Sequence, residues 1–190
     1  MAPSNEKLLY LWARIHFQFG ENSTSTADKL RWYERTKAIC ETLRTLNENN
    51  PLGHLWWASA YGRIGQLRGV MRSLFMVPVL KQEFTRTLEL DPANATAHDA
   101  LGVLYYTLPA FAGGSLAKAE EHLCKALSID PNYTLARLDL AKTYLKAGHR
   151  AEARRQLELV LATTNPTIPA DYFLDDRPEA ERLLRELGNQ

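Results

Sequence analysis

The strongest constraint on the fold is a five-residue sequence motif that occurs twice, as Leu88-Glu89-Leu90-Asp91-Pro92 and as Leu127-Ser128-Ile129-Asp130-Pro131. In both copies an amphipathic helical pattern ends at Asp-Pro. Proline stops a helix because it lacks the N–H that the helix interior needs and its ring clashes with the preceding turn. A chain that repeats a helix together with its stop signal is expected to build a stack of helical units.

The clearest unit runs from Thr134 to about Thr167. Its two helices carry apolar and small residues at helical spacing, namely Leu140, Ala141, Tyr144 and then Ala153, Leu157, Val160. Gly148, in the turn between them, suits a helix C-cap because glycine adopts the left-handed conformation without strain. Small alanines let the two helices approach closely while the larger side chains fill the seam. This spacing and a length of about 34 residues are typical of the tetratricopeptide repeat (TPR).

Two earlier units repeat the pattern with extra residues between their helices. The corresponding positions are Leu101, Gly102, Tyr105, Ala119, Leu123 and Ala126 in one unit, and Trp57, Ala58, Tyr61, Leu80, Phe84 and Thr87 in the other. The first of these inserts about five residues within Leu108–Ser115, and the second roughly ten around Gly65–Val79, relative to the standard turn. Ser115 is placed to cap the following helix.

These patterns predict an all-α fold, a TPR-like superhelical stack of about four helix pairs with two inter-helix insertions and a C-terminal capping helix. We expect a single domain over residues 1–190, with degenerate repeats at about 5–48, 51–93, 95–133 and 134–167. The capping helix is expected at about 176–187. There Asp176, Pro178 and Glu179 provide an N-cap, an early proline and a capping-box carboxylate.

Three stretches narrow the resemblance beyond TPR proteins in general: Trp56-Trp57-Ala58-Ser59-Ala60-Tyr61-Gly62-Arg63, Leu104–Glu120 with its Pro and Gly-Gly insertion, and Asn132–Arg137 together with the ending Asp175-Asp176-Arg177-Pro178-Glu179-Ala180. Together they resemble the TatT-like TPR lipoprotein T-components of TRAP transporters. They are also similar to the eukaryotic regulator of microtubule dynamics proteins. The resemblance covers roughly residues 8 to 187.

The T-component resemblance implies a soluble helical body, a periplasmic substrate-binding protein as partner, a homotrimer, and a pore or cleft for a small hydrophobic ligand. The sequence as given carries no lipobox cysteine and no leader. It therefore indicates the cytoplasm, and a periplasmic location would require a leader that was trimmed away.

TPR stacks usually bind along a concave face that is lined by the first helix of each pair. The positions expected to face it are Trp56, Ser59, Arg63, Asp99, Val103, Tyr106, Leu138, Lys142 and Lys146, joined by Phe75, Met76 and Phe111 from the insertions. Aromatic anchors with charges of both signs suit a peptide segment or an amphiphilic small molecule. Alternatively, Trp56 and Tyr106 pack beneath the insertions, since large aromatics usually fill space.

The stretch from Asn49 to Gln82 contains no acidic residue, although it carries Arg63, Arg68, Arg72 and Lys81 among apolar side chains such as Val70 and Met71. A basic amphipathic helix of this kind can dock a partner, lie on an anionic membrane, or fold as a lid over the groove. It can equally be a core helix with a solvated basic edge.

No catalytic or metal-binding motif accompanies the repeats. The five histidines form no HExxH pair, and His54 and His98 fall where TPRs usually carry a large packing ring. The two cysteines form no CxxC pair, and the formal net charge of +1 is too balanced to favour nucleic acid. We therefore expect no cofactor, no metal and no enzymatic activity.

The leading hypothesis is a TPR scaffold that recognises a partner protein, as an accessory subunit of a TRAP-type uptake system. The alternative is a carrier with an internal pore or cleft for a small hydrophobic ligand. Its motivation is the apolar content of the longer insertion and Phe111 in the shorter one. Either site is expected where the insertions meet the concave groove.

Overall fold

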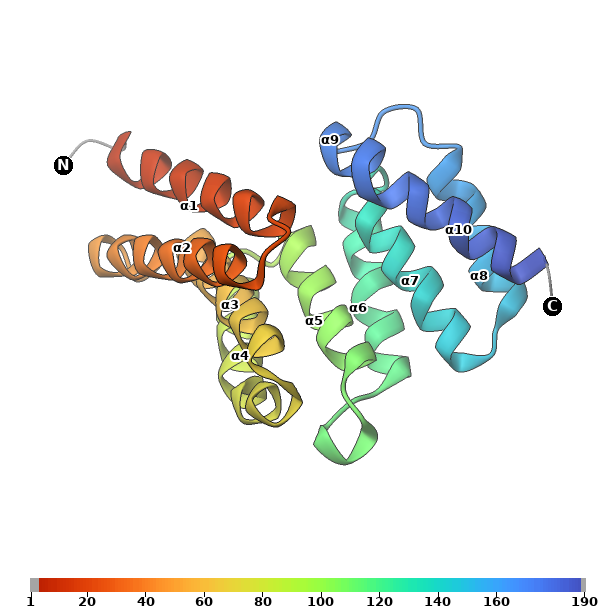
Figure 1. Ribbon diagram of the computed structural model, residues 1–190, viewed down its shortest axis with the longest axis horizontal. Coiled ribbons are helices and arrows are strands. Elements are labelled where there is room, and N and C mark those ends of the chain that lie inside the picture. The colour runs from red at the N-terminus through yellow and green to blue at the C-terminus, as the bar shows by residue number, and fades with distance from the viewer. Residues whose placement is uncertain (1–3, 189–190) are drawn as a thin grey trace. The chain divides into compact units, whose positions relative to one another are not determined.

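The computed structural model describes residues 4–188, apart from the side chains of Ser4 and of residues 70–73. Val70, Met71 and Arg72 of the basic stretch therefore lie outside the described side chains. The described chain consists of helices, turns and short connections without a strand, which confirms the all-α prediction (Figure 1). It divides between Pro92 and Ala93 into two compact units. Within the described residues, no helix combines the length and the hydropathy that a bilayer crossing requires.

The first unit contains four long helices that pack in chain order: α1 (Ser4–Asn22), α2 (Thr26–Leu46), α3 (Pro51–Arg68) and α4 (Val70–Leu90). Polar caps define where two of them begin. The Ser25 hydroxyl accepts the Asp28 N–H at the start of α2, and the Asn50 side chain accepts the Leu52 N–H at the start of α3. Each cap satisfies a backbone donor that the helix itself leaves unpaired.

The extra residues around Gly65–Val79 form neither a loop nor a lid. They lengthen α3 and α4, and Gly69 alone separates the two helices, with φ of 105°. Only glycine adopts that backbone conformation readily, so the chain can reverse within one residue. Because α4 folds back along α3, it buries Met76, Leu80 and Phe84 in the core of the first unit.

The second unit contains two further helix pairs: α5 (Ala95–Thr107) with α6 (Leu116–Ile129), and α7 (Thr134–Ala147) with α8 (Arg150–Leu161). The short α9 (Pro169–Asp171), the π-helical η2 (Tyr172–Asp176) and α10 (Arg177–Gly188) complete it. Between α5 and α6 the insertion forms a 3-10 turn, η1 (Ala110–Ala112). The Ser115 hydroxyl accepts the Lys118 N–H, as the sequence predicts for the cap of α6.

Close helix packing in the second unit depends on small residues. Ala141 and Ala153 have no exposed surface, and a Cβ on Gly102 would lie 2.6 Å from Leu123 Cγ. Gly148 adopts the predicted left-handed C-cap conformation with φ of 82°. Helix α10 lies along α8 (Figure 1). Its Ala180, Leu183 and Leu187 share a core cluster with α8 side chains. The predicted C-terminal helix is therefore present, and its inner face is part of the core.

Carboxyl groups are buried within this second unit. Asp176 accepts a hydrogen bond from the Thr134 hydroxyl at 2.6 Å, and burial raises its pKa to about 6 despite that bond. Burial also raises the pKa of Asp99 well above its ordinary value, and the nearby carboxylates of Asp139 and Asp176 raise it further. A carboxyl group whose pKa is higher in the folded chain favours folding in its protonated form.

The Asp176→Asn substitution is therefore expected to stabilise the protein at neutral pH. Asp176 weakens the fold as the pH rises from about 4, its pKa in an unfolded chain, through about 6. We expect the variant to match the wild type at pH 4 and to exceed its free energy of unfolding by roughly 2 kcal/mol at pH 7. Urea unfolding at several pH values measures this difference.

The neighbouring Asp175→Asn change is the matched control, because the Asp175 side chain is exposed. It should shift stability by no more than a few tenths of a kcal/mol at either pH. If the stability difference between Asp176→Asn and the wild type is the same at pH 7 as at pH 4, the pKa of Asp176 is not raised by burial.

Candidate functional site

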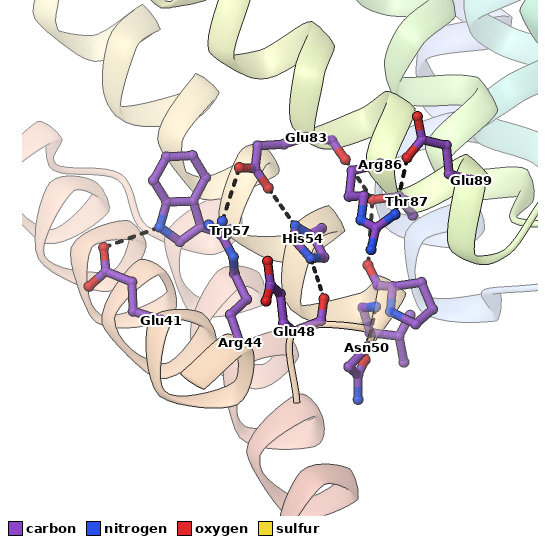
Figure 2. Close-up of polar contacts among 12 residues, drawn as sticks. Glu41, Arg44, Glu48, Asn50, His54, Trp57, Glu83, Arg86, Thr87 and Glu89 are labelled. Atoms are coloured by element: carbon purple, nitrogen blue, oxygen red, sulfur yellow. Dashed lines mark hydrogen bonds and ion pairs between the residues drawn. The ribbon is translucent and has the colours of Figure 1, made fainter. Parts of the chain in front are cut away.

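A buried charged network connects three helices of the first unit (Figure 2). His54 of α3 bonds through Nδ1 to Glu83 Oε2 of α4 at 2.7 Å, and through Nε2 to the Glu48 carbonyl at 2.8 Å. Both partners are acceptors, which are satisfied together when each ring nitrogen carries a proton. Arg44 of α2 donates to Glu83 Oε1 at 3.1 Å. Glu83 thus accepts from two basic side chains of neighbouring helices.

An aromatic pair lies beside this network on α3. The rings of Trp57 and Tyr61 stack with centroids 4.8 Å apart, as residues four apart on a helix can. The Arg44 guanidinium and the Lys37 ammonium lie 5.2 and 5.7 Å from the Trp57 ring centroid, within cation–π range. The Trp57 indole N–H donates to Glu41, as Figure 2 shows. The Trp57 ring is therefore fixed from several directions.

The Glu41 carboxylate is shared between Trp57 and Lys37, whose Nζ lies 2.7 Å from Glu41 Oε1. The hydrogen bond from Lys37 is the main reason that the pKa of Glu41 lies below its ordinary value, and the bond from Trp57 lowers it further. Glu41 is therefore ionised at neutral pH, and the surface combines cations, an anion and aromatic rings.

A cavity of about 240 Å³ opens next to the aromatic pair, between α2, α3 and α4. The residues that line it come from all three helices: Glu34, Lys37, Tyr61, Ile64, Arg68, Phe75 and Met76. Arg68 and Glu34 form a half-exposed ion pair at 2.8 Å within this lining. We call the cavity and the adjoining residues Lys37, Trp57 and Tyr61 the α2–α4 surface.

The two candidates from the longer insertion differ in what they offer to a partner. Phe75 is 80% exposed at the cavity, whereas Met76 is buried in its wall. The sequence predicts that both residues join the concave groove, and of the two Phe75 presents a large apolar surface to solvent.

The other candidates in the first unit mainly make contacts within the chain. The Trp56 ring packs edge-on against Phe17 at 5.1 Å and joins a core cluster, and its buried N–H has no hydrogen-bond partner among the described residues. Ser59 donates to the Leu55 carbonyl, and Arg63 forms an ion pair with Glu21 of α1 at 2.9 Å. This packing fits the alternative prediction that Trp56 fills space. That alternative expects the ring beneath the insertions, whereas the structure packs it against α1 and α2.

Two candidates in the second unit are buried, so the prediction that they face a binding groove is wrong for them. Leu138 belongs to the core cluster that α10 covers, and Asp99 lies among the buried carboxylates. Leu138 is buried because α7 packs against helices on several sides. The periodicity of a single helix does not show such neighbours.

The remaining candidates of the second unit lie nearer its surface. The Lys146 ammonium lies 5.2 Å from the Tyr106 ring centroid and donates to the Tyr106 carbonyl, which joins the ends of α7 and α5. Lys142 forms an ion pair with Asp139 at 3.2 Å, Val103 is half-buried, and Phe111 on η1 is 87% exposed. Because these residues have different neighbours, they do not form one defined site.

The residues that form the ion-pair network and the aromatic pair of the first unit are not among those predicted from the sequence to bind. Trp57 and Tyr61 occupy packing positions of the repeat, while Lys37 and Arg44 lie on a second helix, where no binding residue was expected. Glu83 is the first acidic residue after the stretch Asn49–Gln82, but its basic partner Arg44 lies outside that stretch. The sequence therefore carries no local signal for this ion pair.

Chemically, the α2–α4 surface offers aromatic, cationic and apolar groups. Within residues 4–188, no group of three or more His, Cys, Asp or Glu side chains is arranged to hold a metal ion. The buried His54–Glu83 pair has Arg44 and backbone as its further partners and does not line the cavity. Aromatic rings beside cations and a small cavity are features of protein-binding surfaces.

The fold belongs to the TPR class. A thermophilic TPR protein of Thermus thermophilus superposes with a TM-score of 0.62 at 22% identity, over 95% of this chain and 91% of that one. The MamA protein superposes with a TM-score of 0.54 at 16% identity, over 92% and 89% of the two chains. At these identities the likeness establishes the helical-repeat fold and confirms the TPR-like prediction.

The chain belongs to the regulator of microtubule dynamics family, because the sequence model of the family described as "Regulator of microtubule dynamics protein 1-3" matches residues 2–188. It is 29% identical to regulator of microtubule dynamics protein 1 of Bos taurus, over 97% of this chain and 62% of that protein. It is 22% identical to protein 3 of Rattus norvegicus, over 95% and 42%. The chain thus spans about three fifths and two fifths of these relatives' lengths. Of the two predicted resemblances, this one is confirmed.

Replacing Glu83 by alanine is expected to destabilise the first unit strongly. The change removes the acceptor shared by His54 and Arg44 and leaves the buried imidazole without its carboxylate. Deleting one member of a buried ion pair typically costs about 3 kcal/mol or more, since the remaining charge is desolvated and unpaired. Urea unfolding at pH 7 measures the loss.

The matched control on the same helix is Glu89→Ala, which removes an exposed ion pair with Arg86. Its expected cost is below about 1 kcal/mol. Equal costs for the two substitutions would show that the Glu83 network does not hold the helices together.

Proposed function

We propose that this chain is a non-catalytic TPR-like adaptor that binds a segment of a partner protein at the α2–α4 surface. The observation that carries the proposal is the cavity between three helices, with the fixed Trp57–Tyr61 pair on one side and the exposed Phe75 on the other. Aromatic residues that are held rigidly next to a pocket lose little entropy when they bind, and they dominate many protein interfaces.

The size of the cavity favours a partner's side chain as its occupant. Sites for small molecules usually measure about 300–1,000 Å³ and enclose most of the ligand. The cavity at the α2–α4 surface has a volume of about 240 Å³, and one in the second unit, beside Gly148 and Leu187, has about 250 Å³. A cavity of this size accommodates one large apolar side chain, so it supports recognition of a polypeptide over carriage of a hydrophobic ligand in an internal pore.

The charges around the cavity suggest the chemistry of the segment. Lys37 and Arg68 both line it and are partly exposed, and their carboxylate partners Glu41 and Glu34 are themselves accessible. Such exposed pairs are weak and can exchange partners at little cost. We therefore propose a segment with one large apolar residue flanked by an acidic residue that replaces Glu34 on Arg68.

The relatives supply a class of partner to test. They are named regulators of microtubule dynamics, so proteins that associate with microtubules are the first class to examine. An accessory role in a TRAP-type uptake system, a periplasmic substrate-binding protein as partner and a homotrimer stay predictions from the other resemblance. The adaptor role does not depend on the cellular compartment.

The adaptor proposal predicts that Phe75→Ala weakens partner binding with little effect on folding. Because the side chain is 80% exposed, its removal leaves the core intact, whereas loss of a large anchor from a bound interface costs about 2 kcal/mol. A photo-crosslinker at position 74 captures the partner, the crosslinked segment is identified, and calorimetry measures its affinity. We expect Phe75→Ala to weaken it about thirtyfold.

Phe173→Ala is the control, since Phe173 is also exposed but lies on η2 of the second unit. It should leave the affinity unchanged. If Phe75→Ala and a Lys37→Glu charge reversal both bind the segment as tightly as the wild type does, the α2–α4 surface is not the binding site.

A further inference from the structure

Helix α1 presents an apolar stripe to solvent that is separate from the α2–α4 surface. Leu8, Leu11, Trp12, Ile15 and Phe19 recur at helical spacing, and each is between 39% and 62% exposed. Residues at this spacing lie on one face of a helix. The opposite face, with Ala13 and Phe17, packs into the first unit. Helix α1 is therefore apolar on two faces, and the described part of the chain covers only one of them.

The stripe belongs to a helix that is anchored at both ends. Near its start, Glu6 accepts hydrogen bonds from the side chains of Asn47 and Asn50. Near its end, Glu21 accepts from Tyr33 at 2.7 Å and pairs with Arg63 at 2.9 Å. An exposed apolar face on a firmly held helix is a preformed surface, because little conformational entropy remains to be lost on binding.

The rings on the stripe are held in place by a histidine beneath them. His16 is buried, its Nδ1 lies 2.8 Å from the Trp12 carbonyl, and its ring contacts Trp12, Phe19 and Trp32. Phe19 and Trp32 also contact each other, with centroids 5.1 Å apart. The aromatic cluster thus extends the stripe from α1 onto α2 and limits the rotation of its rings.

Helix α10 of the same chain shows what an apolar stripe with this spacing packs against. Its apolar residues Ala180, Leu183, Leu184 and Leu187 have the same spacing as Leu8, Leu11, Trp12 and Ile15. The α10 set packs against α8 and covers the core of the second unit. The α1 set has the pattern of a helix-packing seam with the facing helix absent among the described residues.

Charge and area restrict the identity of the missing helix. Lys7 and Arg14 are exposed and lie two turns apart, which places both on one edge of the stripe. Five half-exposed large side chains present about 450 Å² of apolar surface, taking 150–250 Å² for a large side chain that is free. A stable interface between folded subunits usually needs about 800 Å² from each partner. The stripe therefore suits one helix better than a second copy of the chain.

We propose that the α1 stripe is a docking site for an amphipathic helix of a partner protein, with an acidic edge that faces Lys7 and Arg14. The partner's apolar residues recur every three and four positions and pack between Leu8, Trp12 and Ile15, as α10 packs on α8. This site goes beyond the adaptor function of the α2–α4 surface and does not depend on it.

A membrane surface fits the stripe less well. Helices that lie in a bilayer interface carry a broad solvent-facing polar side rich in Lys and Arg. The side of α1 opposite the stripe packs against α2. The exposed cations of α1 beside the stripe are Lys7 and Arg14, and Arg31 of α2 lies over the Trp32 ring. The rings are also fixed by His16, which matches a protein interface with preorganised anchors.

The test uses two stapled helical peptides of about 18 residues, long enough to span α1. Both carry leucine at the α10 spacing; one has glutamate along one edge and its twin has lysine there. Fluorescence anisotropy with the full chain measures affinity. We expect the glutamate peptide to bind at least about tenfold more tightly than its twin, and the Lys7→Glu/Arg14→Glu double variant to reverse that preference.

Ile15→Glu should abolish binding of the glutamate peptide, while Leu174→Glu, an exposed leucine of the second unit, and Phe75→Ala should leave it unchanged. Circular dichroism confirms that the variants fold. Equal affinity for the two peptides, or binding that survives Ile15→Glu, overturns the proposal. Two further results would overturn it. One is that the chain floats with phosphatidylcholine–phosphatidylserine vesicles and Ile15→Glu abolishes the flotation. The other is that the chain dimerises in sedimentation equilibrium and Ile15→Glu abolishes the dimer.

Discussion

The organisation of the first unit depends on one buried carboxylate. Glu83 of α4 accepts from His54 of α3 and from Arg44 of α2, so a single side chain links three helices. Buried ion pairs contribute little net stability compared with a well-packed apolar core, since desolvation offsets much of their attraction. Their geometric demand is strict, however, and an error in helix register would leave charges unpaired. We infer that the network fixes how α2, α3 and α4 meet, and with it the position of Arg44 against Trp57.

The two units use polar burial differently. In the first unit the buried carboxylate of Glu83 has two basic partners. In the second unit Asp99, Asp139 and Asp176 lie near one another, and the pKa values of Asp99 and Asp176 are raised, although Asp139 also pairs with Lys142. The second unit compensates with close packing, as Gly102 against Leu123 and the α10 seam show. Each unit also contains a cavity of similar volume, about 240 Å³ in the first unit and about 250 Å³ in the second. The binding role that we propose for the first unit therefore rests on the aromatic and charged residues around its cavity.

The fold was largely predictable because it depends on local periodicity. Asp-Pro stops, the Gly148 cap and the Ala141–Ala153 approach are read directly from spacing, and the structure contains all of them. The proposed binding surface was less predictable, because its arrangement depends on contacts between residues far apart in the chain, such as Arg44 with Glu83. Leu138 was misplaced for the same reason. The residues of the α1 stripe recur at helical spacing, but only the packing of α2 shows which of the two apolar faces of α1 stays exposed.

The central claim is that a partner's side chain enters the cavity between α2, α3 and α4. A crystal structure of the chain bound to the segment captured beside Phe75 tests it most directly. The account predicts a large apolar side chain of that segment in contact with Tyr61, Ile64 and Phe75, with Glu83 still bonded to His54 and Arg44. A complex that leaves this cavity empty while the segment lies on the second unit would contradict it.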